Sequence, residues 1–169
     1  MLELLAPAGN LDAVIAAVQN GADAVYMGFG DGFNARRSAD NFTRESFAKA
    51  VRYCHIRGCK VYVTLNTLVG DREMEAAAAL AQQASDAGAD AILVQDLGLA
   101  RVLRDALPDI PLHASTQMSI HNLAGVEAAA EMGITRAVLS RELSLEQIRF
   151  ISQHASIETE VFVHGALCF

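Results

Sequence analysis

The sequence of 169 residues has no tryptophan, only three cysteines and 6% aromatic residues. The three cysteines, Cys54, Cys59 and Cys168, are too few and too scattered for a disulfide-stapled domain, and they are typical of a reducing compartment. The N-terminus lacks a basic stretch and reaches Pro7 too early for a signal peptide. No apolar run approaches the ~20 residues that cross a bilayer. We therefore expect a cytoplasmic protein with no membrane partner.

Positive charge is also scarce, because 13 Lys and Arg residues stand against 20 Asp and Glu residues, for a formal net charge of −7. A chain this acidic is not, by itself, an electrostatic binder of nucleic acid or of anionic membranes. The apolar fraction of 52% excludes a disordered tail. A chain of this length supports one domain that buries roughly 70% of its unfolded surface.

One unit recurs along the chain: an amphipathic helical segment, a glycine that ends it, and a short apolar run. Glycine suits the end of a helix because it adopts the left-handed conformation without strain. The helix-ending glycines are Gly21, Gly58, Gly88 and Gly133. Strands are predicted over 2–6, 24–28, 60–66, 91–95, 111–115, 136–140 and 158–163. Helices are predicted over 11–20, after the N-cap Thr43, over 72–87, 97–107 and 121–132, and after Ser144 with Leu145, Ile148 and Ile151 buried.

The alternation of strands and helices predicts a parallel sheet with right-handed crossovers. An open doubly wound sheet and a (β/α)8 barrel both fit this pattern. Seven strands exceed most small open sheets, whereas a TIM barrel has eight strands and ~250 residues. The chain also stops at Phe169, directly after an apolar run. We expect an α/β fold, an incomplete TIM-barrel-like (β/α)8 barrel with about seven parallel strands and outer helices. Residues 1–169 would form one N-terminal domain, cut before its last strand and a cysteine-rich C-terminal part.

Polar residues follow six of the predicted strands, at the edge that carries the active site in parallel α/β folds. The catalytic candidates among them are Asn66, Gln117, Arg141, Glu142 and His164. We expect all but Glu142 to converge on one cavity. Two alternatives stay open: Arg141 and Glu142 also fit an exposed ion pair, and His164 also fits a buried, satisfied histidine. Asp96 and Ser115 fit loop or helix-cap residues better than a site.

The remaining candidates are a glycine-rich stretch and a cysteine. The stretch 28–32 is similar to a phosphate-binding loop, but no helix follows it directly, which favours an ordinary loop. Arg36 and Arg37 beyond it fit either a phosphate contact or plain surface. Cys54 lies on an apolar helix face and is expected in the core. Cys168 stands at the mouth of the last strand, where a thiolate is a nucleophile or one ligand of a metal cluster.

The stretch 160–168 reads Glu-Val-Phe-Val-His-Gly-Ala-Leu-Cys and resembles the first half of the signature of peptidase family U32, the collagenase-like proteases. Four other stretches are similar to that family, namely 3–10, 21–26, 63–66 and 139–144. The resemblance implies a barrel-like domain at the N-terminal end of a protein of about twice this length or more. It also implies two activities, because the family includes collagen-degrading peptidases and proteins that hydroxylate tRNA or rRNA bases.

The hydroxylating members imply an iron–sulfur cluster on four cysteines, the first of which matches Cys168. The other three are absent from this sequence, so we expect the cluster in the full-length protein, and neither a cluster nor activity in this segment alone. Hydroxylation of tRNA or rRNA is the leading expectation, with the RNA bound through regions outside this chain. Proteolysis and a non-catalytic binding scaffold are the alternatives. A peptidase needs a nucleophile or a metal-activated water, and neither is evident.

An incomplete barrel leaves two strand edges without partners. The apolar interior, from strands such as 60–66 and 158–163, would also be partly uncovered. We therefore expect the chain to self-associate as a symmetric homodimer that covers the open side.

Overall fold

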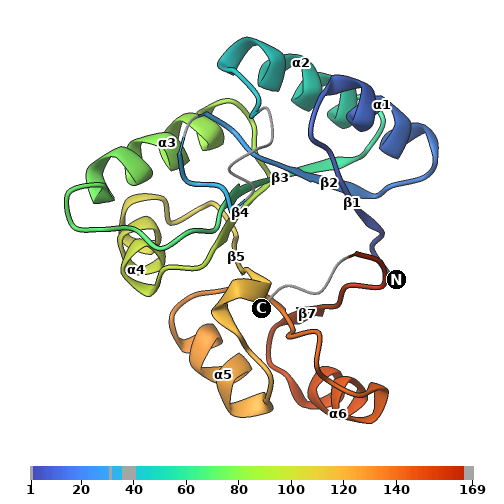
Figure 1. The fold of residues 1–169 in the computed structure, drawn as a ribbon, viewed down its shortest axis with the longest axis vertical. Helices are drawn as coiled ribbons and strands as arrows, with labels where there is room; N and C mark the ends of the chain where they lie inside the picture. Colours follow the sequence, from blue (N-terminus) through green and yellow to red (C-terminus); the bar gives the residue numbers. More distant parts are fainter. Residues whose placement is uncertain (1, 31, 36–40, 166–169) are drawn as a thin grey trace.

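Seven parallel strands form one sheet in chain order in the computed structural model, which describes residues 2–30, 32–35 and 41–165 (Figure 1). Each strand is hydrogen-bonded in parallel to the next one along the chain. The strands are β1 (Leu5–Pro7), β2 (Ala24–Met27), β3 (Lys60–Leu65), β4 (Ala91–Val94), β5 (Leu112–Ala114), β6 (Arg136–Val138) and β7 (Glu158–Glu160). The predicted parallel α/β architecture is therefore confirmed.

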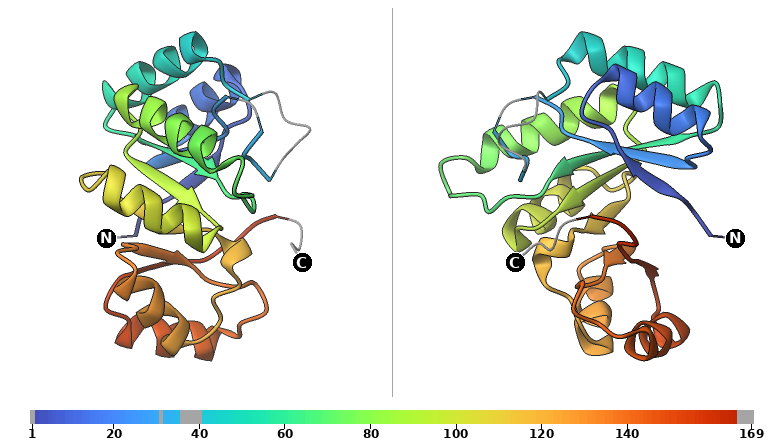
Figure 2. Two further views of the ribbon diagram at one scale, coloured as in Figure 1. Left: turned by 90° about the vertical axis from the view of Figure 1, so that its left-hand side faces the viewer. Right: turned by 45° about the vertical axis from the view of Figure 1, so that its right-hand side comes forward.

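In the described part of the chain, six α-helices surround this sheet on its outer side (Figures 1 and 2). They are α1 (Leu11–Gln19), α2 (Arg44–His55), α3 (Met74–Asp86), α4 (Leu97–Ala106), α5 (Leu123–Glu131) and α6 (Leu145–His154), and a short 3-10 helix, η1 (Thr116–Met118), precedes α5. Thr43, Asp96 and Ser144 accept a backbone N–H at the start of α2, α4 and α6, as the sequence predicts for N-caps. The four helix-ending glycines have φ values from +72° to +97°, in the left-handed region.

The two faces of the sheet carry different chemistry. Val61, Val63 and Leu65 alternate along β3 toward the helices and belong to the large apolar core. Only a small apolar cluster lies on the inner face, made by Ala24, Tyr62, Ala91 and Leu93. Side chains buried on the inner face also include polar and charged ones, namely Thr64, His113, Ser115 and Arg136. The interior of the barrel therefore mixes apolar side chains with polar and charged ones.

The sheet curls into an open ring, so that β1 and β7 face each other across its open side (Figure 1). Within the described part of the chain, β1 pairs only with β2, and β7 pairs only with β6. Exposed apolar side chains lie on this side, among them Leu2 and Val163. The two uncovered edges are those from which a homodimer was predicted, and self-association remains a prediction.

Two expectations about the C-terminal third are wrong in detail. Strand β7 ends at Glu160 rather than at Val163, so the alternation that was expected to carry on to His164 stops early, and His164 is exposed. Leu145 is 82% exposed, although its position at the start of α6 suggested burial. The helix is held instead through Ile151, which is 3% exposed, and Ile148, which packs against the core.

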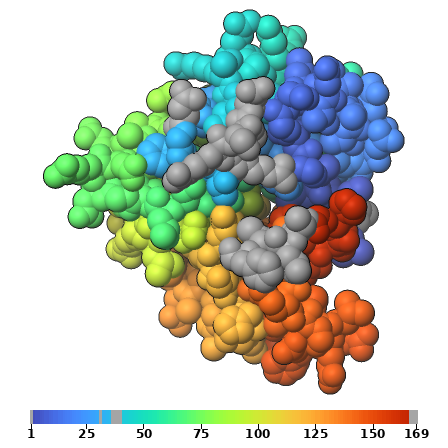
Figure 3. Space-filling view, viewed as in Figure 1, coloured from blue at the N-terminus to red at the C-terminus, as the bar shows by residue number. Residues whose placement is uncertain are grey.

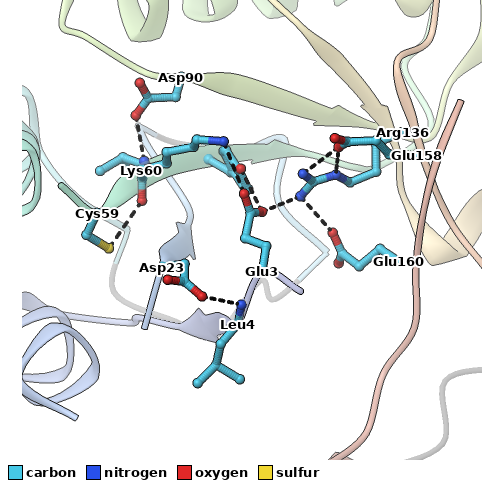
Figure 4. Close-up of polar contacts among 11 residues, drawn as sticks. Glu3, Leu4, Asp23, Cys59, Lys60, Asp90, Arg136, Glu158 and Glu160 are labelled. Atoms are coloured by element: carbon cyan, nitrogen blue, oxygen red, sulfur yellow. Dashed lines mark hydrogen bonds and ion pairs between the residues drawn. The ribbon is translucent and has the colours of Figure 1, made fainter. Parts of the chain in front are cut away.

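Arg136, the first residue of β6, connects the two sides of the opening at the amino-terminal ends of the strands (Figure 4). Its Nη1 donates to Glu3 Oε1 at 2.6 Å, and its Nε and Nη2 donate to Glu158 Oε2 at 2.8 and 2.6 Å. Glu3 also accepts bonds from Lys60 Nζ at 3.1 Å and from Tyr62 Oη at 2.8 Å. Charge-assisted bonds of this kind are among the stronger hydrogen bonds in proteins. Glu3, which precedes β1, is thus joined directly to β3 and β6 and, through Arg136, to β7.

These contacts change the pKa values of the groups at the base of the barrel. Burial raises the pKa of Glu3, but hydrogen bonds from Arg136, Tyr62 and Lys60 outweigh it and lower the pKa from 4.5 to about 2. Burial also lowers the pKa of His113 from 6.5 to about 3, and the positive charge of Arg136 adds to this effect. The ring of His113 is edge-on to Tyr62, with centroids 4.9 Å apart. Glu3 is therefore held ionised and His113 neutral.

Replacing Arg136 tests whether this ion cluster stabilises the fold. We expect Arg136→Leu to lower the free energy of unfolding by about 2 kcal/mol, because it leaves Glu3 shielded from water and without its main partner. Urea denaturation at pH 7 measures the change. Arg101→Leu is the matched control, since Arg101 pairs with Asp105 on the exposed surface, and it should cost under about 0.5 kcal/mol. Equal losses for the two variants would contradict a stabilising role for the cluster.

The neutral, buried His113 predicts a particular loss of stability in acid. Because its folded pKa lies below the ordinary 6.5, the unfolded chain takes up the proton first as the pH falls. The neutral His113 therefore contributes fully to the free energy of unfolding above pH 6.5. As the pH falls from 6.5 toward 3, the free energy of unfolding decreases by up to about 1.4 kcal/mol per pH unit. We expect His113→Leu to reduce the slope of unfolding free energy against pH between 6.5 and 5, while His121→Leu on the exposed surface keeps it. A wild-type slope in His113→Leu would refute this account.

Candidate functional site

A cleft of about 1070 Å³ runs along the open side of the ring and over the carboxyl ends of the strands. One wall is formed by residues 2–9 and the other by residues 158–165. In the space-filling view, the last described residues lie beside the N-terminal segment (Figure 3). A smaller pocket of about 50 Å³, lined by Tyr26, Thr64 and Glu160 among others, lies inside the ring. The carboxyl ends of the strands are where enzymes with parallel barrels place their active sites.

Four of the five catalytic candidates line this one cleft: Asn66, Gln117, Arg141 and His164. Glu142 is exposed and is not part of the cleft wall. Cys168 lies outside the described residues, as do Arg36 and Arg37. The structure thus brings the polar residues after β3, β5, β6 and β7 together, while their catalytic roles remain predictions.

Asn66 follows β3 directly and connects three parts of the rim. Its Nδ2 donates to Ser115 Oγ after β5 at 3.2 Å, and its Oδ1 accepts the Ala35 N–H from the loop after β2 at 3.2 Å. Ser115 occupies the N-cap position of η1, in agreement with its interpretation as a loop or cap residue, but its side chain makes no capping bond. Asn66 therefore positions neighbouring loops around the cleft.

The loop after β2 brings two more amides to the cleft. Asn34 Nδ2 donates to Asn41 Oδ1 at 3.1 Å, and both residues line the cleft wall with Gly28. A Cβ atom at Gly28 would fall 2.1 and 2.2 Å from these two amide atoms, so only glycine leaves room for the pair. Gly28, the first residue of the stretch 28–32, thus allows the side chains of Asn34 and Asn41 to pack directly against the backbone. The sequence offered no signal for this pair.

Arg141 has an unusual environment for an arginine. Its guanidinium carbon lies 4.0 Å from the centre of the Phe162 ring, a cation–π contact. Among the described residues, its Nε and Nη1 are shielded from water and have no hydrogen-bond partner, and the same is true of Gln117 Oε1. Within the described residues, Arg141 forms no ion pair with Glu142 or with any other carboxylate, so the predicted alternative of an exposed ion pair is not what the structure shows.

Glu160 is a candidate that the search of strand ends missed. It faces the interior from the last position of β7 and lines both the cleft and the inner pocket. Burial raises the pKa of its carboxyl, although Arg136 counteracts part of the rise. Its Oε2 lies 3.5 Å from Arg136 Nη1 and makes no hydrogen bond. A shielded carboxyl with a raised pKa in a cleft can exchange a proton with a bound molecule. The alternation of side chains along 158–160 was the feature of the sequence that could have indicated that Glu160 faces the interior.

The described cysteines do not fit a metal centre. Cys54 and Cys59 are both buried and free, and burial raises the pKa of each, to about 12 for Cys54. Across residues 2–30, 32–35 and 41–165, no group of three or more His, Cys, Asp or Glu side chains is arranged to hold a metal ion. These residues therefore offer no site for an iron–sulfur cluster. None of the described helices is both long and apolar enough to cross a bilayer.

Known proteins resemble this chain over nearly its whole length. The 23S rRNA 5-hydroxycytidine C2501 synthase of Escherichia coli is 44% identical over 99% of this chain, which corresponds to 25% of that protein. The tRNA hydroxylation protein P1 of Bacillus subtilis is 40% identical over 98% of this chain and 39% of that protein. The chain thus spans well under half the length of these two relatives.

A solved structure shows the same fold. The U32 peptidase Mk0906 superimposes with a TM-score of 0.77, covering 95% of this chain and 68% of that one at 17% identity. The family model described as peptidase family U32 matches residues 9–169, which is almost the entire sequence. The chain therefore belongs to peptidase family U32.

Proposed function

We propose that this chain is the barrel domain of an enzyme that hydroxylates a base of tRNA or rRNA. The observation that carries the proposal is its 44% and 40% identity, over nearly all of its residues, to proteins named for rRNA and tRNA hydroxylation. The cleft supports it, because polar side chains from four strand ends meet there. Since the chain covers only part of each relative, the activity belongs to a protein that includes further residues, and RNA contacts outside this chain are part of the proposal.

The described residues provide binding and proton transfer. Asn66 holds the loops after β2 and β5 in place at the rim of the cleft. Glu160, with its raised pKa, is placed to give a proton to a reacting base or to take one from it. Replacing a group with this role costs typically about 10²–10⁴-fold in rate.

Proteolysis is the second candidate, because it is the activity in the family's description. Hydrolysis of a peptide bond requires an activated nucleophile or a metal-activated water. Among the described residues that line the cleft there is no cysteine, and no hydroxyl group is hydrogen-bonded to His164. The cleft geometry therefore favours hydroxylation over proteolysis.

We propose further that Cys168 is one of four cysteine ligands of an iron–sulfur cluster in the complete enzyme. The resemblance of residues 160–168 to the family signature supports this role. Four thiolates are the usual ligand set of such clusters. Cys54 and Cys59 are buried and do not fit the set, so the remaining ligands would come from outside this chain. We assign no reaction step to the cluster.

A chimera tests the activity. This chain replaces the corresponding segment of the Bacillus subtilis tRNA hydroxylation protein P1 in a strain that lacks the protein, and mass spectrometry of digested tRNA measures hydroxylated nucleosides. We expect the chimera to restore the modification, and Glu160→Gln to reduce it about 100-fold or more. Glu45→Gln on the exposed face of α2 is the control and should retain it. A folded chimera that leaves tRNA unmodified would argue against the function, and an active Glu160→Gln against the role of Glu160.

The cluster is tested on the same chimera by iron and acid-labile sulfide analysis after anaerobic purification. We expect Cys168→Ser to lose both elements and Cys54→Ser to keep them, because only the former removes a ligand. The isolated 169-residue chain should contain neither in stoichiometric amount, since it provides one ligand of four. Stoichiometric iron and sulfide in Cys168→Ser, or in the isolated chain, would overturn this assignment.

A further inference from the structure

We propose that the cleft binds a single extruded RNA nucleotide, with Arg141 on its phosphate and Gln117 and the neighbouring amides on its sugar and base edge. This inference rests on the proposed function, because it takes RNA as the substrate. Enzymes that modify a base inside structured nucleic acid generally take that base out of its stack and into a pocket. Such a pocket needs a cation for the phosphate, and hydrogen-bonding groups and an aromatic ring for the base.

Arg141 has hydrogen-bond donors that an anion could satisfy. Two of its nitrogens, Nε and Nη1, are shielded from water and have no acceptor among the described residues, which is costly for a charged side chain. The Phe162 ring covers one face of the guanidinium, and the Gly165 backbone packs close by, since both terminal nitrogens lie 3.8 Å from where a Cβ of Gly165 would be. Arg141 lines the cleft, so a small rotation of its guanidinium would turn these donors toward an oxyanion bound there, which would supply the missing acceptors.

The other arginine of the cleft wall is already satisfied. Arg136 contacts the carboxylates of Glu3, Glu158 and Glu160 within 3.5 Å. The described lining holds no lysine, so Arg141 is its one Lys or Arg side chain free of a carboxylate contact. A chain of net charge −7 with one such group fits one phosphate and does not fit the long path of a duplex backbone. The charge distribution therefore points to a single nucleotide.

Apart from Arg136 and the three carboxylates that it contacts, the cleft wall is rich in amides. Gln117 Oε1 has no donor, and Asn34, Asn41 and Asn66 line the same cleft. Amide side chains present both donors and acceptors, which is what the hydrogen-bonding edges of a base offer in return. Phe162 remains 36% exposed beside Arg141, and exposed aromatic rings are the usual stacking partners of splayed-out bases. The volume of about 1070 Å³ is at the upper end of pockets that hold small ligands.

Binding of mononucleotides to the 169-residue chain tests the site. Isothermal titration compares cytidine and uridine 5′-monophosphates with the two nucleosides, with inorganic phosphate and with malonate. We expect the monophosphates to bind at least about tenfold more tightly than any of the others. Arg141→Gln should weaken monophosphate binding about tenfold or more and leave nucleoside binding unchanged, since a hydrogen bond to a charged group is worth about one to two powers of ten in affinity.

Two further variants separate the role of charge from that of folding. Arg149→Gln, on the exposed face of α6, removes a positive charge away from the cleft and should bind like the wild type. Arg141→Lys keeps the charge but loses the planar pair of donors, and should fall between the wild type and Arg141→Gln. Gln117→Leu should weaken monophosphates and leave phosphate unchanged. Thermal unfolding confirms that each variant is folded before its affinity is compared.

Other results would overturn the proposal. Phosphate or malonate binding as tightly as the monophosphates would show a small-anion site, and equal affinities of Arg141→Gln and Arg149→Gln would remove Arg141 from the site. The chimera distinguishes this inference from the proposed function. Unchanged tRNA hydroxylation by Arg141→Gln at limiting tRNA would refute the nucleotide site and leave the function standing. Nucleotide binding as expected with an inactive chimera would refute the function and leave the site.

Discussion

The fold depends on how an open parallel sheet manages its two free edges. A closed barrel satisfies every strand by pairing it on both sides, whereas here β1 and β7 each have one neighbour within the described chain. Arg136 replaces part of that missing pairing by ion pairs that reach from β6 to Glu3 before β1 and to Glu158 and Glu160 on β7. Because the ion pairs join the amino-terminal ends of the strands, the carboxyl-terminal ends stay free to form a cleft.

This arrangement explains why the inner face carries charged side chains. Arg136 is 8% exposed, and burying a guanidinium so fully is tolerable only with several carboxylates around it. Its partners must therefore also face inward, which places Glu158 and Glu160 at alternate positions of β7. Glu160 is the farther of the two from the guanidinium and retains an oxygen without a hydrogen bond. The same ion cluster that holds the base of the ring thus delivers a carboxyl with a raised pKa to the cleft.

Local signals in the sequence were enough to predict the elements and their order. Glycines with left-handed backbone and side-chain N-caps act within a few residues, and the parallel sheet follows from the alternation of helices and strands. The end of β7 was predicted three residues too late, because the run 161–163 is as apolar as a strand but has no partner beyond it. Leu145 was predicted to be buried because it lies one helical turn from Ile148. Helical spacing alone does not show whether another element packs against that position, and Leu145 is exposed.

Only part of the candidate site could be predicted, because local sequence patterns do not reveal contacts between distant segments. Asn66, Gln117, Arg141 and His164 stand at strand ends, and parallel topology brings strand ends together whatever their chemistry. What the sequence does not contain is which side chains satisfy one another. Arg136 and Arg141 are five residues apart and chemically identical, yet one is surrounded by carboxylates and the other has buried donors without an acceptor. That difference arises from contacts between segments up to 133 residues apart, such as Glu3 with Arg136. It is also what separates an arginine that maintains the barrel from one that is available to a ligand.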